Sequence, residues 1–405
     1  GTVSEKVIKA GTATDYNSGT IVELTAEPTG DWEFVGWTGD ITSTENPVQI
    51  TIDNAKTVTA IFKESPFYLD ENGVTIKALN WVTVGATGKL GGLTYTAVNN
   101  TTLKSMVDNG EDVTKVVTTL VNNMKELFKD KYYNVDISSW DTSNVTDMSF
   151  MFRGEGYSLA PFNQDISSWD VSNVTSMRFM FSESKFNQDI SSWNVSNVTD
   201  MMGMFSGGDS LYDTFTPFNQ DISSWDVSNV TNMSSMFKNS LFNQNISNWN
   251  VSNVTFMGSM FMNAKVFNQS IGKWDMSSVT GISNMFRGSY KSPDQVRFNG
   301  DIGNWNVSNV TSMSDLFRGN RVFNQDIGSW DVSKVTNMSS MFRGTVTFNQ
   351  DIGRWDVSKV TDMGYMFTTA SNFNQDIGRW DVSKVKRRNM DYMFAEAQYF
   401  NQNLT

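Results

Sequence analysis

The side chains that could do chemistry in this chain are carboxylates and other oxygen ligands, because it contains neither histidine nor cysteine. Histidine is the commonest general base and imidazole ligand, and cysteine supplies thiolate nucleophiles and metal sites. Their absence excludes Ser-His-Asp, Cys-His and zinc-hydrolase mechanisms, together with disulfide bonds. Paired carboxylates remain, which glycoside hydrolases hold about 5–10 Å apart in a cleft.

One regular column of acids and amides could bind calcium. An Asp or Asn follows each repeated tryptophan, and strands stacked about 4.8 Å apart would bring these side chains together. Like charges at that spacing repel, and Ca²⁺ prefers such oxygen ligands. Interspersed Asn residues, with Lys273, Arg354 and Arg379 in the neighbouring column, would relieve the repulsion without metal. We keep a calcium column and a solvated or self-paired ladder both open. The candidate calcium ligands are Asp170, Asp226, Asp331, Asp356 and Asp381.

No catalytic residue is assigned and no enzyme is expected, because the column offers neither a cleft nor a means of separating the pKa values of one carboxylate pair. No cofactor other than this calcium is expected.

The elements that must position these residues come from an internal repeat. Successive tryptophans are spaced 29, 24, 32, 24, 25, 31, 25, 25 and 25 residues apart, which indicates about ten units. One unit cannot bury its apolar side alone, so stacked units would share one hydrophobic core. The marker tryptophans are Trp140, Trp169, Trp193, Trp225, Trp249, Trp274, Trp305, Trp330, Trp355 and Trp380.

Each unit is predicted to contain a short strand and a short helix. Ile190, Trp193 and Val195 have the spacing of a leucine-rich-repeat strand, and Met201, Met204 and Phe205 lie at i, i+3 and i+4. A threonine before this stripe stands where a helix N-cap is expected. The tryptophans and methionines are interpreted as core, and the Asn after each Phe as a column that satisfies the backbone at a turn.

Three units carry inserts at one place, between Met-Phe and Phe-Asn: Arg153–Pro161, Ser206–Pro217 and Arg287–Arg297. Identical placement puts them on the same edge of the array. Exposed aromatic residues on adaptable loops suit recognition of proteins or glycans, although tolerated insertion at a surface turn explains the same pattern. The candidate binding residues at this edge are Tyr157, Tyr212, Phe215 and Tyr290.

The run Phe-Asn-Gln-Asp-Ile-Ser-Ser-Trp-Asp-Val-Ser-Asn-Val-Thr-Asp-Met, followed by Met-Phe, resembles the 26-residue surface-protein repeat of mycoplasmas and Bacteroidetes, which is related to BspA-like leucine-rich repeats. The resemblance covers about 118–405 and implies an α/β repeat solenoid displayed on the bacterial surface, often in adhesins. It implies no catalytic residues.

Residues 1–64 predict an all-β module. Alternating runs lie at 21–26 and 57–62, and Phe34-Val35-Gly36-Trp37-Thr38-Gly39-Asp40 lies between them. This motif resembles an internalin-type B-repeat, a β-grasp-like module common in stalks, and Trp37 is interpreted as core. Residues 66–117 predict a cap of β-hairpins and one helix, capped by Thr102 and ending at Gly110. The array, 118–405, breaks off within a unit, so we expect a longer protein.

The net charge of −12 disfavours nucleic acid as a partner, and no apolar stretch is long enough to span a membrane as a helix. We expect a secreted or surface-displayed bacterial protein that binds other surface proteins, host or matrix proteins, or polysaccharides. The alternative is a passive spacer or stalk of a larger surface protein, since near-perfect repetition offers no unique site. Ice binding through the regular threonine column is a further alternative.

Overall fold

The computed structural model describes the chain except for residues 12–18, 30–31, 156–157, 209–213, 289–295 and 405. The described residues fall into two compact units. The first comprises Gly1–Met106, Glu111–Leu120 and Ser139–Asp141, and the second comprises Val107–Gly110, Val121–Ser138 and Thr142–Thr405.

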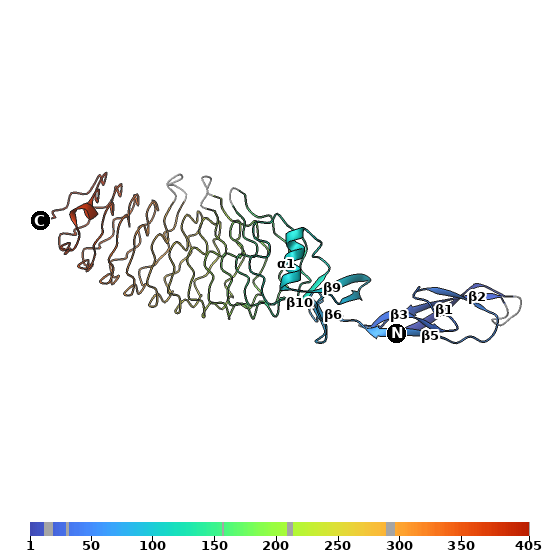
Figure 1. Cartoon of the computed structure of the whole chain (residues 1–405). Coiled ribbons are helices and arrows are strands. Elements are labelled where there is room, and N and C mark those ends of the chain that lie inside the picture. The colour runs from blue at the N-terminus through green and yellow to red at the C-terminus, as the bar shows by residue number, and fades with distance from the viewer. Residues whose placement is uncertain (12–18, 30–31, 156–157, 209–213, 289–295, 405) are drawn as a thin grey trace. The chain divides into compact units, whose positions relative to one another are not determined.

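Residues 1–64 form two small antiparallel sheets (Figure 1). One sheet has the order β1-β2-β4, and β3 pairs with β5 in the other. The runs predicted at 21–26 and 57–62 are confirmed as parts of β2 and β5. The strands are β1 (Thr2–Lys9), β2 (Thr20–Glu27), β3 (Trp32–Gly39), β4 (Val48–Ile52) and β5 (Val58–Glu64).

The core prediction for Trp37 is confirmed. Its side chain is buried, its Nε1 donates to the Glu45 carbonyl at 2.9 Å, and its ring centroid lies 5.2 Å from that of Phe34. Gly39, near the end of the same motif, has a φ of 101°, and a Cβ there would collide with the Thr57 carbonyl. The motif therefore encodes a buried indole followed by a turn that requires glycine.

Residues 67–120 form two hairpins and a parallel crossover. The β6–β7 hairpin turns at Asn72-Gly73, with Gly73 at a φ of 72° and the Asn72 Oδ1 accepting from the Thr75 amide at 2.9 Å. The second sheet has the order β10-β9-β8, and helix α1 joins β9 to the parallel strand β10. The elements are β6 (Phe67–Leu69), β7 (Ile76–Ala78), β8 (Thr87–Leu90), β9 (Leu93–Asn99), α1 (Asn100–Asn109) and β10 (Val116–Leu120).

The helix begins earlier than its predicted cap at Thr102. Asn99 is the capping residue: its Oδ1 accepts from the Thr102 amide at 3.0 Å, and the Thr102 hydroxyl accepts from the Asn99 amide at 2.9 Å. This reciprocal pair is a capping box, in which Thr102 occupies the third helical position. The predicted end is confirmed, because Gly110 follows the helix with a φ of 75°.

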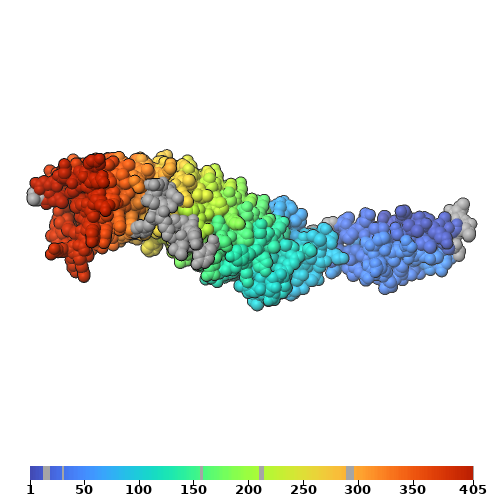
Figure 2. Space-filling model, turned by 90° about the horizontal axis from the view of Figure 1, so that it is seen from above, coloured from blue at the N-terminus to red at the C-terminus, as the bar shows by residue number. Residues whose placement is uncertain are grey.

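Residues 121–405 form an array of repeats in which each repeat bonds to the next through its backbone (Figure 1). The amides of Met177, Phe179 and Phe181 donate to carbonyls of the following repeat at 2.8–3.0 Å. The repeats follow one another in chain order along the surface (Figure 2). Residues that form parallel bridges between successive repeats are Asn123, Asp147, Ser176, Asp200, Asn232, Phe256, Gly281, Ser312, Asn337 and Asp362.

The predicted strand and helix within each repeat are wrong. In the described part of 121–405 the repeats are chains of turns and single bridges, and the helical segment found there is a four-residue 3-10 turn at Arg387–Met390. The i, i+3, i+4 stripe is real, because Met201, Met204 and Phe205 are all buried. An α-helix would use their amides within the repeat, whereas alternate amides bond to the next repeat here.

This backbone pattern places residues of each repeat in the left-handed region, and several repeats have two of them four positions apart, such as Phe179 and Glu183. We call the residues at the earlier position the left-handed column; their φ angles range from 52° to 63°, which is unfavourable for any residue other than glycine. The column consists of Glu126, Phe150, Phe179, Gly203, Ser235, Ser259, Asn284, Asp315, Ser340, Tyr365 and Tyr392.

Stacked aromatic rings form the core of the array, as predicted for its tryptophans. The ring of Phe181 lies 4.0 Å from Phe186 and 5.8 Å from Phe205, with interplanar angles of 10° and 7°. The indole Nε1 of Trp193 donates to the Ile166 carbonyl of the previous repeat at 3.2 Å. The buried indole N–H is thus satisfied by a neighbouring repeat, and offset ring pairs contribute roughly 0.5–1.5 kcal/mol each beyond burial.

Candidate functional site: exposed columns and the insert edge of the array

In the column of acids and amides that follows the tryptophans, each candidate aspartate is hydrogen-bonded within a turn of its own repeat. The Asp226 carboxylate accepts a hydrogen bond from the Ser228 amide at 3.0 Å, and the hydroxyl and amide of Ser228 hold the pKa of Asp226 below its usual range. The same contact recurs at Asp331 with Ser333 and lowers the pKa of that carboxyl too. These carboxylates therefore stabilise a turn in their own repeat.

The structure aligns the calcium candidates in one column without gathering them into a chelating group. Among described residues, no three His, Cys, Asp or Glu side chains form a group that could hold a metal ion. At Asp331 the hydrogen bonds from Ser333 lower the pKa most, and the charge of Lys334 lowers it further. Calcium binding stays a prediction, and so does the self-paired ladder. All five candidates accept from the amide two residues on: Asp170, Asp226, Asp331, Asp356 and Asp381.

The asparagine column is confirmed as a structural feature. The Asn163 side chain accepts from the Asn187 amide at 2.8 Å, and the Gln188 side chain donates to the Asn163 carbonyl at 3.0 Å. The threonine column serves the same purpose, so the predicted N-cap role is wrong. The amide and hydroxyl of Thr199 both donate to the Thr175 carbonyl, at 2.9 and 3.2 Å. Both columns join repeats.

The insert edge is described only in part. Tyr157, Tyr212 and Tyr290 lie outside the described residues, so their predicted role is untested. Phe215 is half-buried, and the Lys265 ammonium lies 3.5 Å from its ring centroid, a cation–π contact. A lysine in the equivalent turn two repeats farther along the array thus contacts the aromatic residue at the end of the second insert.

The ends of two inserts are tied to the following repeat. Ala160 bridges to Ser184, and Thr216 bridges to Ser240. The Thr216 hydroxyl also donates to the Phe205 carbonyl at 2.6 Å, across the base of its insert. Insertion at this turn therefore leaves the bonding between repeats intact.

Sequence reasoning missed the aromatic side chains of the left-handed column and the basic side chains beside them. Phe150 and Phe179 stack at 5.3 Å, and the Arg153 guanidinium lies 5.7 Å from each ring centroid. Farther along, Tyr365 and Tyr392 stack at 5.2 Å. The recurring Phe-Arg-Gly at the end of the methionine stripe was the available signal, but the assumed helix gave these residues no common surface.

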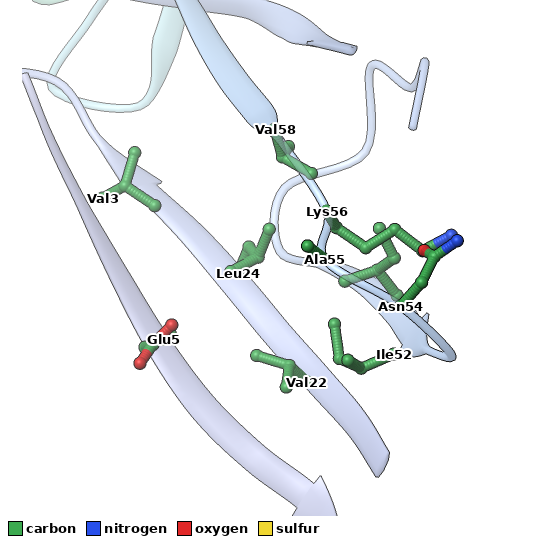
Figure 3. Close-up of a pocket in the computed structure, with 10 residues that line it drawn as sticks. Val3, Glu5, Val22, Leu24, Ile52, Asn54, Ala55, Lys56 and Val58 are labelled. Carbon is green, nitrogen blue, oxygen red and sulfur yellow. The ribbon is translucent and has the colours of Figure 1, made fainter. Parts of the chain in front are cut away.

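A separate pocket of about 450 Å³ lies in the N-terminal module (Figure 3). Aliphatic side chains such as Val22 and Leu24 form its walls, and Glu5 and Lys56 are its charged residues. Lys56 is paired with Asp53 at 2.7 Å. The walls show no converging polar groups of the kind that orient a small ligand, so the repeat array is the stronger candidate.

Comparison with known proteins identifies two families. The family described as "Mycoplasma protein of unknown function, DUF285" matches residues 96–216, 209–297 and 290–405, which together exceed half of the chain. The family described as "Divergent InlB B-repeat domain" matches residues 1–66. Neither description names a catalytic activity. No curated protein and no solved structure matches the chain. Within its described residues, no helix has the length and apolar character needed to cross a membrane.

Proposed function

We propose that this chain, which belongs to the DUF285 family of mycoplasma proteins of unknown function, is a surface-displayed bacterial adhesion protein. It binds protein or glycan partners outside the cell through the exposed columns and the insert edge of its array. The N-terminal divergent B-repeat, a module of surface-protein type, supports this location.

One observation carries the proposal: the inserts leave the core continuous. Phe162, Phe218 and Phe298, which follow the three inserts, are each about 1–3 % exposed, as buried as Phe186 in a repeat without an insert. A scaffold that accepts loops at one turn without loss of core contacts can present variable binding residues there.

The finer architecture is part of this proposal. The successive parallel bridges and the stacked phenylalanines support a solenoid, with one coil per repeat around a common core. We assign 1–64 to the B-repeat module, 66–117 to the cap and 118–405 to the solenoid. Such a solenoid offers an extended surface for a large partner.

A deletion variant tests the role of the insert edge. Removing residues 155–159, 209–215 and 289–295 restores the Phe–Phe intervals of repeats without inserts and keeps Ala160 and Thr216. Intact and shortened chains are titrated onto immobilised matrix proteins, polysaccharides and whole cells. Saturable binding by the intact chain and its loss in a folded shortened chain are expected. Equal binding by both chains would remove the insert edge from the proposal.

The alternative, a passive spacer, is favoured by the repeated use of polar side chains within the array. The Asn, Thr and Asp columns all bond to the array's own backbone. If neither chain binds any member of the panel while both remain folded, the spacer becomes the better account.

A further inference from the structure

Three arginines occupy the same position in consecutive repeats of this acidic protein. Arg287, Arg318 and Arg343 each follow a buried core phenylalanine, and their guanidinium groups contact side chains of the left-handed column. Their backbones are adjacent, since the Gly288 amide donates to the Arg318 carbonyl at 2.7 Å and the Gly319 amide to the Arg343 carbonyl at 2.8 Å. The three side chains are half-buried and therefore held in a row at the spacing of the repeats.

Two of the three arginines donate hydrogen bonds to side chains of the left-handed column. The Arg318 Nη1 donates to the Asp315 Oδ1 at 2.6 Å, and the Arg287 Nη1 donates to the neutral Asn284 side chain at 2.9 Å. Burial, followed by repulsion from Arg287 and Arg343, lowers the pKa of Arg318 to about 10. The guanidinium groups thus act on one another through a partly desolvated surface, where an added anion is favoured.

The row continues into two stacked tyrosines. The Arg343 guanidinium lies 5.0 Å from the ring centroid of Tyr365, and the Tyr365 ring stacks on Tyr392 with an interplanar angle of 13°. Tyr392 is 64 % exposed and Tyr365 is 37 % exposed. Two aligned aromatic faces next to cations suit a sugar ring that carries an acidic group.

Folding does not require the tyrosines at these positions. Both have left-handed backbones, where a bulky residue is unfavourable, and the equivalent positions hold Ser235, Ser259 and Ser340 in other repeats. The presence of exposed aromatic residues at a strained position points to a role outside the fold.

We propose that the arginine–tyrosine stripe, formed by Arg287, Arg318, Arg343, Tyr365 and Tyr392, binds an acidic glycan. Guanidinium groups bind its sulfate or carboxylate groups, and the tyrosine rings stack on its sugar rings. This inference specifies a partner for the proposed adhesion function and rests on it. It names residues other than the four aromatic residues predicted at the insert edge.

Titration calorimetry on the full chain tests the stripe. The probes are a sulfated heparin hexasaccharide, a carboxylated oligogalacturonate of equal length, and neutral maltohexaose. We expect at least one acidic probe to bind, and its affinity to fall as salt is added. Comparing the affinities of the sulfated and carboxylated probes then shows which acidic group is bound. Absence of binding to both acidic probes, or equal binding of maltohexaose, would overturn the proposal.

Variants taken from the array's own repeats locate the site. Tyr392→Ser and Arg318→Ser copy residues found at equivalent positions, and each should weaken binding about tenfold. Asp315→Asn copies Asn284 and should strengthen binding about threefold, because it removes the anion that competes for Arg318. If Asp315 has a purely structural role, Asp315→Asn should not increase the affinity for the acidic glycan.

The matched control is Arg354→Ser with Arg379→Ser, which removes two positive charges from another column where serine is common. If affinity falls as much in this control as in Arg318→Ser, the attraction is nonspecific, and the proposal that the arginine–tyrosine stripe is the binding site is overturned. If the chain adheres to cells or matrix proteins and the stripe variants adhere equally, the stripe fails while the adhesion function stands.

Discussion

Truncation of one core ring, Phe237→Ala, should destabilise the array strongly. The Phe237 side chain is fully buried, and its centroid lies 4.0 Å from Phe242 and 5.8 Å from both Phe205 and Phe261. Removing a buried phenylalanine leaves a cavity and typically costs about 3–5 kcal/mol. Because these stacks link three successive repeats, we expect a loss near the upper end of that range.

Urea denaturation followed by tryptophan fluorescence measures this loss, because the core tryptophans lie beside the same rings. The control is Phe256→Ala in the next repeat, whose side chain is 54 % exposed and should change stability by about 0.5 kcal/mol or less. The dependence of the unfolding free energy on urea concentration must also be compared between the variants, since a repeat array can unfold in stages. Equal destabilisation by the two variants would refute the stacked-ring core.

Three further predictions concern the columns. Asn219→Ala removes the acceptor of the Asn243 amide at 2.8 Å and should lower the free energy of unfolding by about 1 kcal/mol, measured by urea denaturation. Gly203→Ala should lower the melting temperature, because Gly203 has a φ of 63° and a Cβ would collide with the Phe179 ring; an unchanged value would contradict the left-handed column. Because folding lowers the pKa of Asp226 and Asp331 below 3.8, their stabilisation is present above pH 3.8 and is lost as the pH falls through the lowered values. The wild-type melting temperature should therefore drop in acid more than that of a variant with both changed to Asn, as in other repeats.

The core could be predicted from the sequence because its signal is a spacing that recurs in every unit. Trp193, Met201 and Phe205 are buried whether the backbone between them is helical or turned. That same tolerance explains the wrong helix: a stripe at i, i+3 and i+4 fits an α-helix, and it also fits a coil whose alternate amides bond to the next repeat. Hydrogen bonds between repeats decide the backbone, and no single unit contains that information.

The candidate sites differ in how far local sequence could reveal them. The Asp–Ser turns are visible as a short motif in which Ser follows Asp by two positions. The arginine–tyrosine stripe, in contrast, depends on Arg318 and Tyr392 lying on one surface across several repeats. A glycine in the sequence is the usual signal of a left-handed residue, but Tyr365 and Asp315 occupy left-handed positions here. The array overrides their intrinsic preference through contacts between repeats.

The most direct test of the adhesion account is a binding isotherm for the intact chain and for the chain lacking residues 155–159, 209–215 and 289–295, on one panel of matrix proteins, polysaccharides and cells. The account predicts saturable binding by the intact chain that the insert deletion weakens, while both chains retain the same cooperative unfolding. Absence of saturable binding by the folded intact chain to every surface would contradict adhesion and favour a spacer.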